Sequence, residues 1–292
     1  MLYRTNSQSR AIEEALVRAN IPYRIFGGVK FYERKEIKDI LSYMRLVANP
    51  HDRASLMRVV NVPARKLGAK SVETIAEYLD NYGLDCVALA DMLDSVDGLA
   101  GAAREGYRQF GAVLARARER MESASVADVM KSLIEDLGYI AYLEANHTPE
   151  EVTAKRDNLD EFLSLASRYE GLDPLEGYRT FLEEIALITD QDRDSEGERV
   201  SLLTIHLAKG LEFERVVIAG AEEGLFPHSR TLTEPKDMEE ERRLMYVAMT
   251  RAKRELHITR ARERFTFGNY SSNPSSRFLD EIPAEHVDME SK

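Results

Sequence analysis

The sequence predicts an α/β fold in which a parallel sheet is interrupted by a large all-helical insertion. Three observations indicate this class. Strand and helix patterns alternate in the first 27 residues, strands return after residue 200, and the pattern between them is almost entirely helical. Strands on both sides of a helical block are typical of one domain built from two chain segments. We therefore assign residues 1–27 and 200–292 to an α/β domain, and residues 28–199 to the insertion.

The N-terminal segment reads as the end of a strand, a helix and a second strand. In LYRTNSQSRAIEEALVRANIPYRIF, Asn6 or Ser7 is a candidate helix cap and PYRIF is the second strand. The predicted apolar face of the helix consists of Ala11, Ile12, Ala15, Leu16 and Ala19. An opening on a strand indicates that the sequence starts partway through a domain, so its sheet is expected to be incomplete at the N-terminus.

The insertion reads as a series of helices. In ERKEIKDILSYMRLVA, one helix face carries Ile37, Ile40, Leu41, Met44 and Val47. Several later helices end at glycine, among them SVETIAEYLDNYG and VADVMKSLIEDLG. The acidic stretch 189–199 is predicted to be an exposed linker. After it come strands in VSLLTI and RVVIAG, a helix across MEEERRLMYVAMTRA and a strand in ELHIT, and the sequence ends in RFLDEIPAEHVDMESK as a polar tail.

Composition favours a folded protein of a reducing cytoplasm. Cys86 is the only cysteine, which excludes an internal disulfide, and no Cys/His cluster has metal-ligand spacing, so no metal site is predicted. No apolar run reaches the ~20 residues of a membrane helix, and the N-terminus lacks the apolar core of a signal peptide. We expect a cytoplasmic location and no membrane partner.

The net charge of −11 is unevenly distributed. Residues 30–70 hold 10 basic and 4 acidic side chains, whereas residues 71–198 hold 11 basic and 29 acidic ones. A local basic stretch can bind nucleic-acid phosphates while the rest of the surface stays acidic.

Two apparent nucleotide motifs fail on closer reading. GAKS, residues 68–71, lacks adjacent glycine and lysine, and proline occupies position 63 where a phosphate loop needs glycine. In VVIAGAEE, Gly220 and Ala221 separate the strand from Glu222 and Glu223, which favours a solvated turn over a magnesium site.

Three other stretches carry side chains suited to phosphate, and the second and third of them also have a structural alternative. LLTIHLAKGLEFERVVIAG, residues 202–220, places a hydroxyl, an imidazole, an ammonium, a glycine and a carboxylate within nine positions. NVPARKLGAKSVETI is predicted to form a hairpin bounded by Pro63 and Gly68, with Ser71 capping a helix among the cations of Arg65, Lys66 and Lys70. An ordinary capped helix with a solvated basic loop explains this second stretch equally well.

The third stretch is the helix in EEERRLMYVAMTRAKREL. Its spacing places Arg243, Tyr246, Val247 and Thr250 on one face and Arg251 near the helix end, where a guanidinium suits a phosphoryl group. The alternative is an amphipathic helix in which residues 239–243 form surface ion pairs. Taken alone, the helix favours this alternative.

TIHLAKGLEF, EEGLFPH and EEERRLMYVAMTRAKREL occur in one order, preceded by LYRTNSQSRAIEEAL and GGVKFYERKEIKDILSYMRLVANP. In these motifs the chain closely resembles the UvrD/PcrA/Rep family of superfamily 1 DNA helicases, over nearly its whole length. The resemblance implies a RecA-like second motor domain, called 2A, carrying a helical insertion called 2B. ATP with Mg²⁺ is the implied cofactor. The phosphate loop and the Mg²⁺ ligands belong to a first motor domain that is absent from this sequence.

The resemblance also assigns residues to sites. Arg251 matches the catalytic arginine finger on the γ-phosphate, and Glu212 with Gly210 matches the ATP ribose side. Contacts to single-stranded DNA are implied for Arg4, Thr204, His206 and Arg230. Contacts to duplex DNA are implied for Lys38, Lys66, Gly68 and Ser71. The family often has Gly-Ile-Gly where this chain has Lys66-Leu67-Gly68, so close backbone approach at position 66 is in question, and a lysine charge can replace it.

The expected function is that of the C-terminal portion of an ATP-dependent helicase translocating 3′ to 5′ in repair or replication. Its expected partners are single-stranded and duplex DNA, the missing N-terminal motor domain and repair proteins. This chain alone is expected to hydrolyse little or no ATP. A stand-alone DNA-binding or regulatory helicase remnant, and a docking subunit completed by a separate first-domain chain, remain alternatives.

Overall fold

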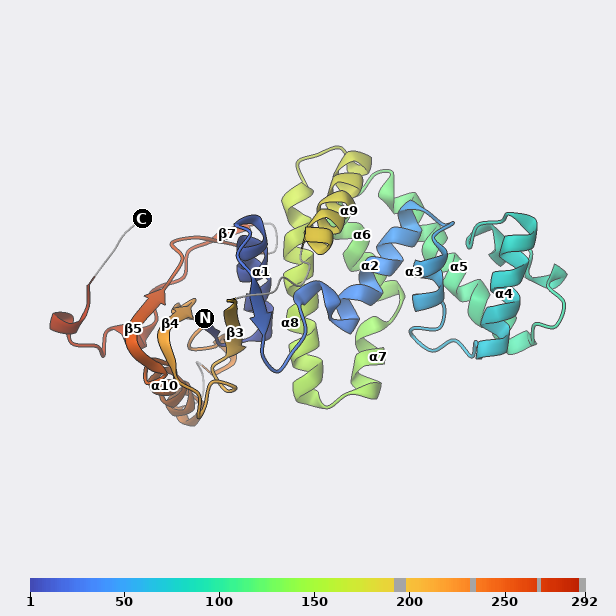
Figure 1. Cartoon of the computed structure of the whole chain (residues 1–292). Helices are drawn as coiled ribbons and strands as arrows, with labels where there is room; N and C mark the ends of the chain where they lie inside the picture. Colours follow the sequence, from blue (N-terminus) through green and yellow to red (C-terminus); the bar gives the residue numbers. More distant parts are fainter. Residues whose placement is uncertain (192–197, 232–234, 267–268, 289–292) are drawn as a thin grey trace. The chain divides into compact units, whose positions relative to one another are not determined.

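The computed structural model describes residues 1–191, 198–231, 235–266 and 269–288. The chain forms two compact units (Figure 1). Unit 1 comprises residues 1–31 together with the chain from residue 192 onward, and unit 2 comprises residues 32–191. These divisions lie four and eight residues from the boundaries predicted from the sequence, at 27/28 and 199/200.

Unit 1 is built on a five-stranded parallel sheet in the order β2-β3-β1-β4-β5. Its strands are β1 (Leu2–Tyr3), β2 (Tyr23–Ile25), β3 (Val200–Thr204), β4 (Phe213–Ala219) and β5 (Ala252–Thr259). Leu2 pairs with Leu203 on one side and with Ile218 on the other, so the first strand of the chain lies inside the sheet. The predicted α/β class with a parallel sheet is confirmed.

Helices cover the sheet through two apolar clusters. Helix α1 (Ser9–Arg18) contributes Leu16 and Val17 to a cluster with Tyr3, Tyr23 and Leu202. Helix α10 (Pro235–Met249) contributes a second set against β4, which includes Leu244, Met245 and Ala248. An antiparallel pair of short strands, β6 (Arg264–Thr266) and β7 (Asn269–Ser271), follows β5 in a stretch for which the sequence patterns predict no element.

The predicted apolar face of α1 is only partly correct. Leu16 is buried, but Ala11, Ala15 and Ala19 are exposed, and polar Ser9, Arg10, Glu13 and Glu14 are buried instead. Glu13 accepts hydrogen bonds from the Ser9 and Tyr23 hydroxyls and from the backbone N–H of Phe31. A satisfied polar network therefore occupies positions where periodicity predicts solvent, because its partners lie in other segments of the chain. The predicted cap at Asn6 or Ser7 is also displaced. These two residues lie in a 3-10 turn, Asn6–Gln8, and the N-cap residue of α1 is Gln8.

Unit 2 is all-helical: no strand occurs between residues 32 and 191, all of which have a described backbone. Its helices are α2 (Lys35–Ala48), α3 (Arg53–Val59), α4 (Ala69–Tyr82), α5 (Gly101–Met121), α6 (Val126–Asp136), α7 (Tyr139–Asn146), α8 (Pro149–Ala166) and α9 (Pro174–Gln191). Helix α2 lies at the centre of the unit, in contact with α3, α5, α6, α8 and α9. All five of its predicted apolar positions are buried: Ile37, Ile40, Leu41, Met44 and Val47. None of the described helices in either unit is long and apolar enough to cross a membrane.

Candidate nucleic-acid and nucleotide interface

Three of the predicted single-strand contacts leave the sheet of unit 1 at the same edge. Strands β1 and β3 run parallel with Tyr3 opposite Thr204, so Arg4 emerges beside Thr204 and His206. The N–H of Ile205 donates to the carbonyl of Tyr3 at 3.0 Å, and the Ile205 side chain is fully buried. The buried isoleucine fixes the turn between the two polar residues. The structure thus brings Arg4, Thr204 and His206 together from segments 200 residues apart in the chain.

The Arg4 guanidinium is held by Glu241, a residue on α10 that the sequence reading placed among surface ion pairs. Nε and Nη2 of Arg4 both donate to Oε1 of Glu241, at 2.9 and 2.6 Å. Oε2 also accepts from the backbone N–H of His228 at 3.1 Å. Only 1% of Glu241 is exposed, so the surface assignment is wrong for this residue. Its helical phase, shared with buried Leu244, Met245 and Ala248, is a signal that was available in the sequence.

His206 lies in the field of this ion pair. Burial, followed by the neighbouring Arg4 guanidinium, lowers the pKa of His206 below its usual value of 6.5, while Glu241 and Glu240 act in the opposite direction. The imidazole is therefore neutral at pH 7 and offers a hydrogen bond rather than a charge. Arg230, the fourth predicted single-strand contact, lies in the 3-10 turn Ser229–Thr231, directly after His228. Its side chain is outside the described residues.

The three residues assigned to ATP meet at one loop beside the end of α10. Gly210 has φ +86°, a left-handed conformation that glycine adopts without steric cost. The Arg251 guanidinium donates from Nη1 to the carbonyl of Leu211 at 3.0 Å, next to both Gly210 and Glu212. Glu212 is largely exposed, with Lys253 Nζ at 3.8 Å. The exposed carboxylate of Glu212 and the guanidinium of Arg251 therefore lie at the same loop.

Arg251 is folded back onto the protein. Besides the bond to Leu211, its Nε donates to the carbonyl of Val247 and its Nη2 to the hydroxyl of Thr250, each at 3.0 Å. All three guanidinium nitrogens are therefore engaged. Reaching an external phosphate requires the side chain to exchange these bonds for new ones.

The two rejected nucleotide motifs have structural roles. Residues 69–71 are the first turn of α4, and no phosphate loop surrounds them. Glu222 is fully buried, where it accepts two hydrogen bonds from Arg264, at 2.7 and 2.8 Å, and one from the N–H of Ala261. The predicted solvated turn is therefore wrong for Glu222. Within the described part of the chain, no group of three His, Cys, Asp or Glu residues is arranged to hold a metal ion.

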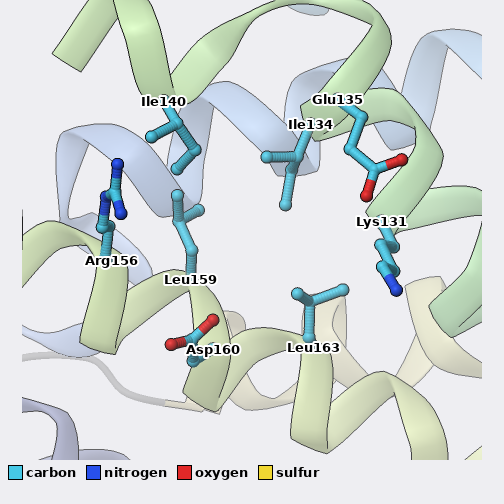
Figure 2. Close-up of a pocket in the computed structure, with 8 residues that line it drawn as sticks. All are labelled: Lys131, Ile134, Glu135, Ile140, Arg156, Leu159, Asp160 and Leu163. Carbon is cyan, nitrogen blue, oxygen red and sulfur yellow. The ribbon is translucent and has the colours of Figure 1, made fainter. Parts of the chain in front are cut away.

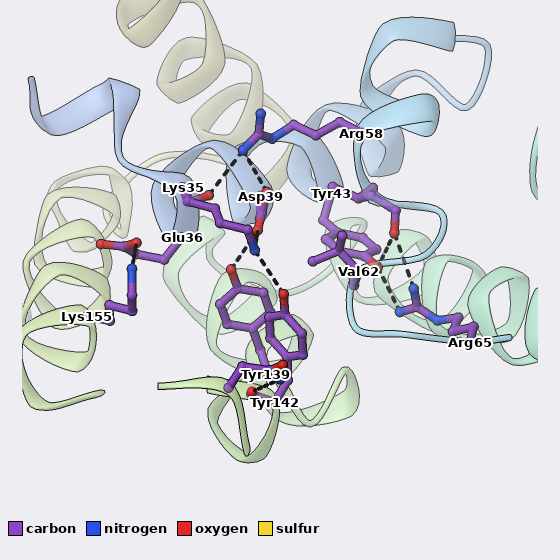
Figure 3. Close-up of polar contacts among 12 residues, drawn as sticks. Lys35, Glu36, Asp39, Tyr43, Arg58, Val62, Arg65, Tyr139, Tyr142 and Lys155 are labelled. Atoms are coloured by element: carbon purple, nitrogen blue, oxygen red, sulfur yellow. Dashed lines mark hydrogen bonds and ion pairs between the residues drawn. The ribbon is translucent and has the colours of Figure 1, made fainter. Parts of the chain in front are cut away.

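In unit 2, the basic loop between α3 and α4 is organised from inside by Arg65. Its guanidinium donates to the Tyr43 hydroxyl at 2.7 Å (Figure 3). It also donates to the carbonyls of Val59, Val60 and Pro63 at 3.1 to 3.2 Å. Arg65 therefore stabilises the loop and is not part of a free cationic surface, contrary to the sequence reading.

The outer side of the loop carries the predicted duplex contacts. Lys66 is exposed with φ +60°, next to buried Leu67. Gly68, also exposed, occupies the N-cap position of α4. No side chain caps the helix, so the prediction that Ser71 does so is wrong: Ser71 is already its third residue.

Lys38, the remaining duplex candidate, is exposed on α2 beside a cluster that the sequence reading missed. Buried Asp39 accepts from Arg58 at 2.7 Å, from the Tyr139 hydroxyl at 2.8 Å and from Lys35 at 3.2 Å (Figure 3). One carboxylate thus orders two cations on the same side of the unit, at positions where sequence spacing alone indicates scattered surface charges.

A hollow of about 290 Å³ between α6, α7 and α8 contains none of the predicted site residues. Its lining is mixed, with Ile134, Ile140, Leu159 and Leu163 beside charged Lys131, Glu135, Arg156 and Asp160 (Figure 2).

Comparison with known proteins identifies relatives over nearly the full sequence. The family model for UvrD-like helicase C-terminal domains matches residues 1–263. The ATP-dependent DNA helicase PcrA of Bacillus subtilis (strain 168) is 42% identical over 290 residues, covering 97% of this chain and 39% of the relative. The PcrA protein of Staphylococcus aureus (strain NCTC 8325) has the same identity and coverage. That of Staphylococcus epidermidis (strain RP62A) is 42% identical over 295 residues, covering 99% of this chain and 40% of the relative. The chain spans about two fifths of the length of these helicases.

Proposed function

Because the chain belongs to the UvrD-like helicase C-terminal domain family, we propose that it is the C-terminal portion of an ATP-dependent, superfamily 1 DNA helicase. In this proposal it works in the cytoplasm, in repair or replication with repair proteins as partners, and moves 3′ to 5′ along DNA. Unit 1 supplies the single-strand contacts and half of an ATP site, and unit 2 supplies duplex contacts. A first motor domain, outside these 292 residues, supplies the phosphate loop and the Mg²⁺ ligands.

The loop at Leu211 carries this proposal. It brings Gly210, Glu212 and Arg251 together. Glu212 suits the ribose hydroxyls as an exposed acceptor, and the Arg251 fork suits a phosphoryl group. Neither group forms the cradle of backbone N–H groups that a triphosphate needs. The residues thus fit one side of a nucleotide and support a site divided between two domains.

The DNA contacts proposed for unit 1 lie together at the edge of the sheet where the parallel strands β1 and β3 end. Arg4 offers charge, while Thr204 and neutral His206 offer hydrogen bonds. This composition suits a DNA backbone rather than base reading. In unit 2, exposed Lys38 and Lys66, with the open backbone at Gly68 and the hydroxyl of Ser71, suit duplex phosphates. Nucleotide-driven domain closure would couple the two functions.

The test is DNA-stimulated ATP hydrolysis by this chain alone and after mixing with a separately expressed first motor domain of a PcrA relative. We expect turnover only in the mixture. Arg251→Ala should reduce it by about 10³-fold, the usual effect of losing an arginine finger, while DNA binding persists. Arg254→Ala is the matched control, because Arg254 is exposed on β5 and pairs with Glu214.

Near-normal turnover by the Arg251→Ala mixture would refute the finger role. Hydrolysis by the chain alone would show that it holds a complete nucleotide site. If neither sample hydrolyses ATP but DNA binding is retained, the result favours the alternative function, a DNA-binding or regulatory helicase remnant.

A further inference from the structure

Glu241 connects three parts of the edge at which the proposed single-strand contacts lie. It belongs to α10, pairs with Arg4 at the end of β1, and accepts the backbone N–H of His228 in the loop after β4. Arg4 and Glu241 are 237 positions apart in the sequence. The carboxylate is 1% exposed, so solvent screens its bonds poorly and an unpaired charge there would be costly.

The pairing leaves one side of the Arg4 guanidinium available. Nε and Nη2 both face Glu241, and Nη1 makes no hydrogen bond to any described residue. The Arg4 side chain is 20% exposed, compared with 2% for that of Glu241. A guanidinium has a rigid fork of five N–H donors, so fixing one edge also fixes the direction of the other.

We propose that Glu241 is a positioning residue for DNA binding: it holds one edge of the Arg4 guanidinium so that the other edge meets a single-strand phosphate. This inference rests on the proposed single-strand function of the same edge. Its second bond, to the N–H of His228, fixes the neighbouring loop, which carries Arg230.

The proposal makes a prediction opposite in sign to simple electrostatics. Removing a carboxylate next to a DNA-binding edge raises the local positive potential, and charge alone predicts tighter DNA binding. If Glu241 positions Arg4, the variant Glu241→Gln binds single strands more weakly instead. A glutamine amide has one acceptor oxygen and one NH2 donor, so either Arg4 or the His228 N–H must face a donor, and in both orientations the charge that holds Arg4 is lost.

The experiment measures binding of a fluorescein-labelled oligothymidylate to the full chain as a function of salt. Arg4→Ala and Glu241→Gln should each weaken binding by about fivefold, in the range of one modest ionic contact. Each should also reduce the salt slope by about 0.7, the counterion release of one single-strand phosphate. The double variant should bind no more weakly than Arg4→Ala, because both changes remove the same contact.

The matched control is Glu239→Gln, which removes the same charge from the same helix but from an exposed residue that pairs with Arg242. It should leave binding unchanged or slightly stronger. Binding of duplex DNA serves as a second readout: Glu241→Gln should leave the proposed duplex contacts in unit 2 intact, whereas general unfolding would not.

Arg4→Lys keeps the test decisive if Glu241→Gln does not fold. Lysine retains the charge but cannot form the two-point bond to Glu241, so positioning predicts a loss close to that of Arg4→Ala. Wild-type binding by Arg4→Lys would overturn the inference, as would unchanged or tighter binding by folded Glu241→Gln while Arg4→Ala binds weakly. Wild-type binding by Arg4→Ala would instead overturn the proposed single-strand contact itself.

Discussion

Lys66 has a backbone conformation that favours glycine. Its φ of +60° lies in the left-handed region, which costs a residue with a Cβ roughly 1 kcal/mol or more. Buried Leu67 and the Asn61 side chain, which accepts from the N–H groups of Arg65 and Leu67, impose this conformation. The chain therefore carries a local conformational cost at an exposed cation, which supports a role for the ammonium group itself.

Replacing Lys66 with glycine should separate stability from DNA binding. We expect Lys66→Gly to raise the free energy of unfolding by about 1 kcal/mol, since the left-handed strain is relieved. Its salt slope for duplex DNA should fall by about 0.9, the counterion release of one duplex phosphate. Chemical denaturation and duplex titrations at several salt concentrations measure the two effects.

Lys70→Ala is the control, because Lys70 is exposed in the first turn of α4 at an ordinary helical φ. It removes the same charge without relieving strain, so it should not stabilise the chain by the same amount. An unchanged duplex salt slope for Lys66→Gly would argue against a phosphate contact at this position.

At the scale of elements, the contact between α5 and the basic loop decides where the proposed duplex contacts lie. Gly106 faces the loop, and a Cβ there would overlap the carbonyl oxygen of Arg65. Arg65 in turn joins the loop to Tyr43 of α2. Backbone atoms cannot rotate away as a flexible side chain can, so the helix and the loop must separate if position 106 gains a side chain.

Gly106→Ala should therefore lower the free energy of unfolding by about 1–3 kcal/mol, as overpacking usually does, and should weaken duplex binding by displacing Lys66 and Gly68. Gly101→Ala, in the same helix, is the matched control, because a Cβ there meets nothing within 4 Å. It should change stability by no more than about 0.5 kcal/mol in the destabilising direction. Equal thermal stability of the two variants would contradict the close packing of α5 against the loop.

At the scale of the whole molecule, the two units depend differently on chain continuity. Unit 2 is one uninterrupted segment with its own buried helix α2, whereas unit 1 needs both ends of the chain. Strand β1 lies between β3 and β4, so the C-terminal segment alone lacks a strand from within its sheet. Folding of unit 1 must therefore wait for two distant segments to meet, and the continuous unit has no such requirement.

Expressed alone, residues 32–191 should unfold in one cooperative transition with a helical circular-dichroism spectrum. Residues 198–292 alone should show no such transition. Joining residues 1–31 to them through a Gly-Ser linker should restore it. A cooperative melt of the isolated C-terminal segment would contradict the structural importance of β1.

The α/β class, the order of the elements and the family resemblance follow from the sequence alone. Periodicity reports which face of an element is buried, so all five predicted core positions of α2 were correct, and short motifs preserve their order along the chain. The roles of the charged residues, in contrast, follow from the folded structure. Glu241 and Glu222 are buried beside Arg4 and Arg264, and Arg65 faces into its own loop. A charged side chain is buried only where folding brings it a partner, and that partner can lie as far as 237 residues away in the sequence. The spacing of neighbouring residues does not identify such a partner.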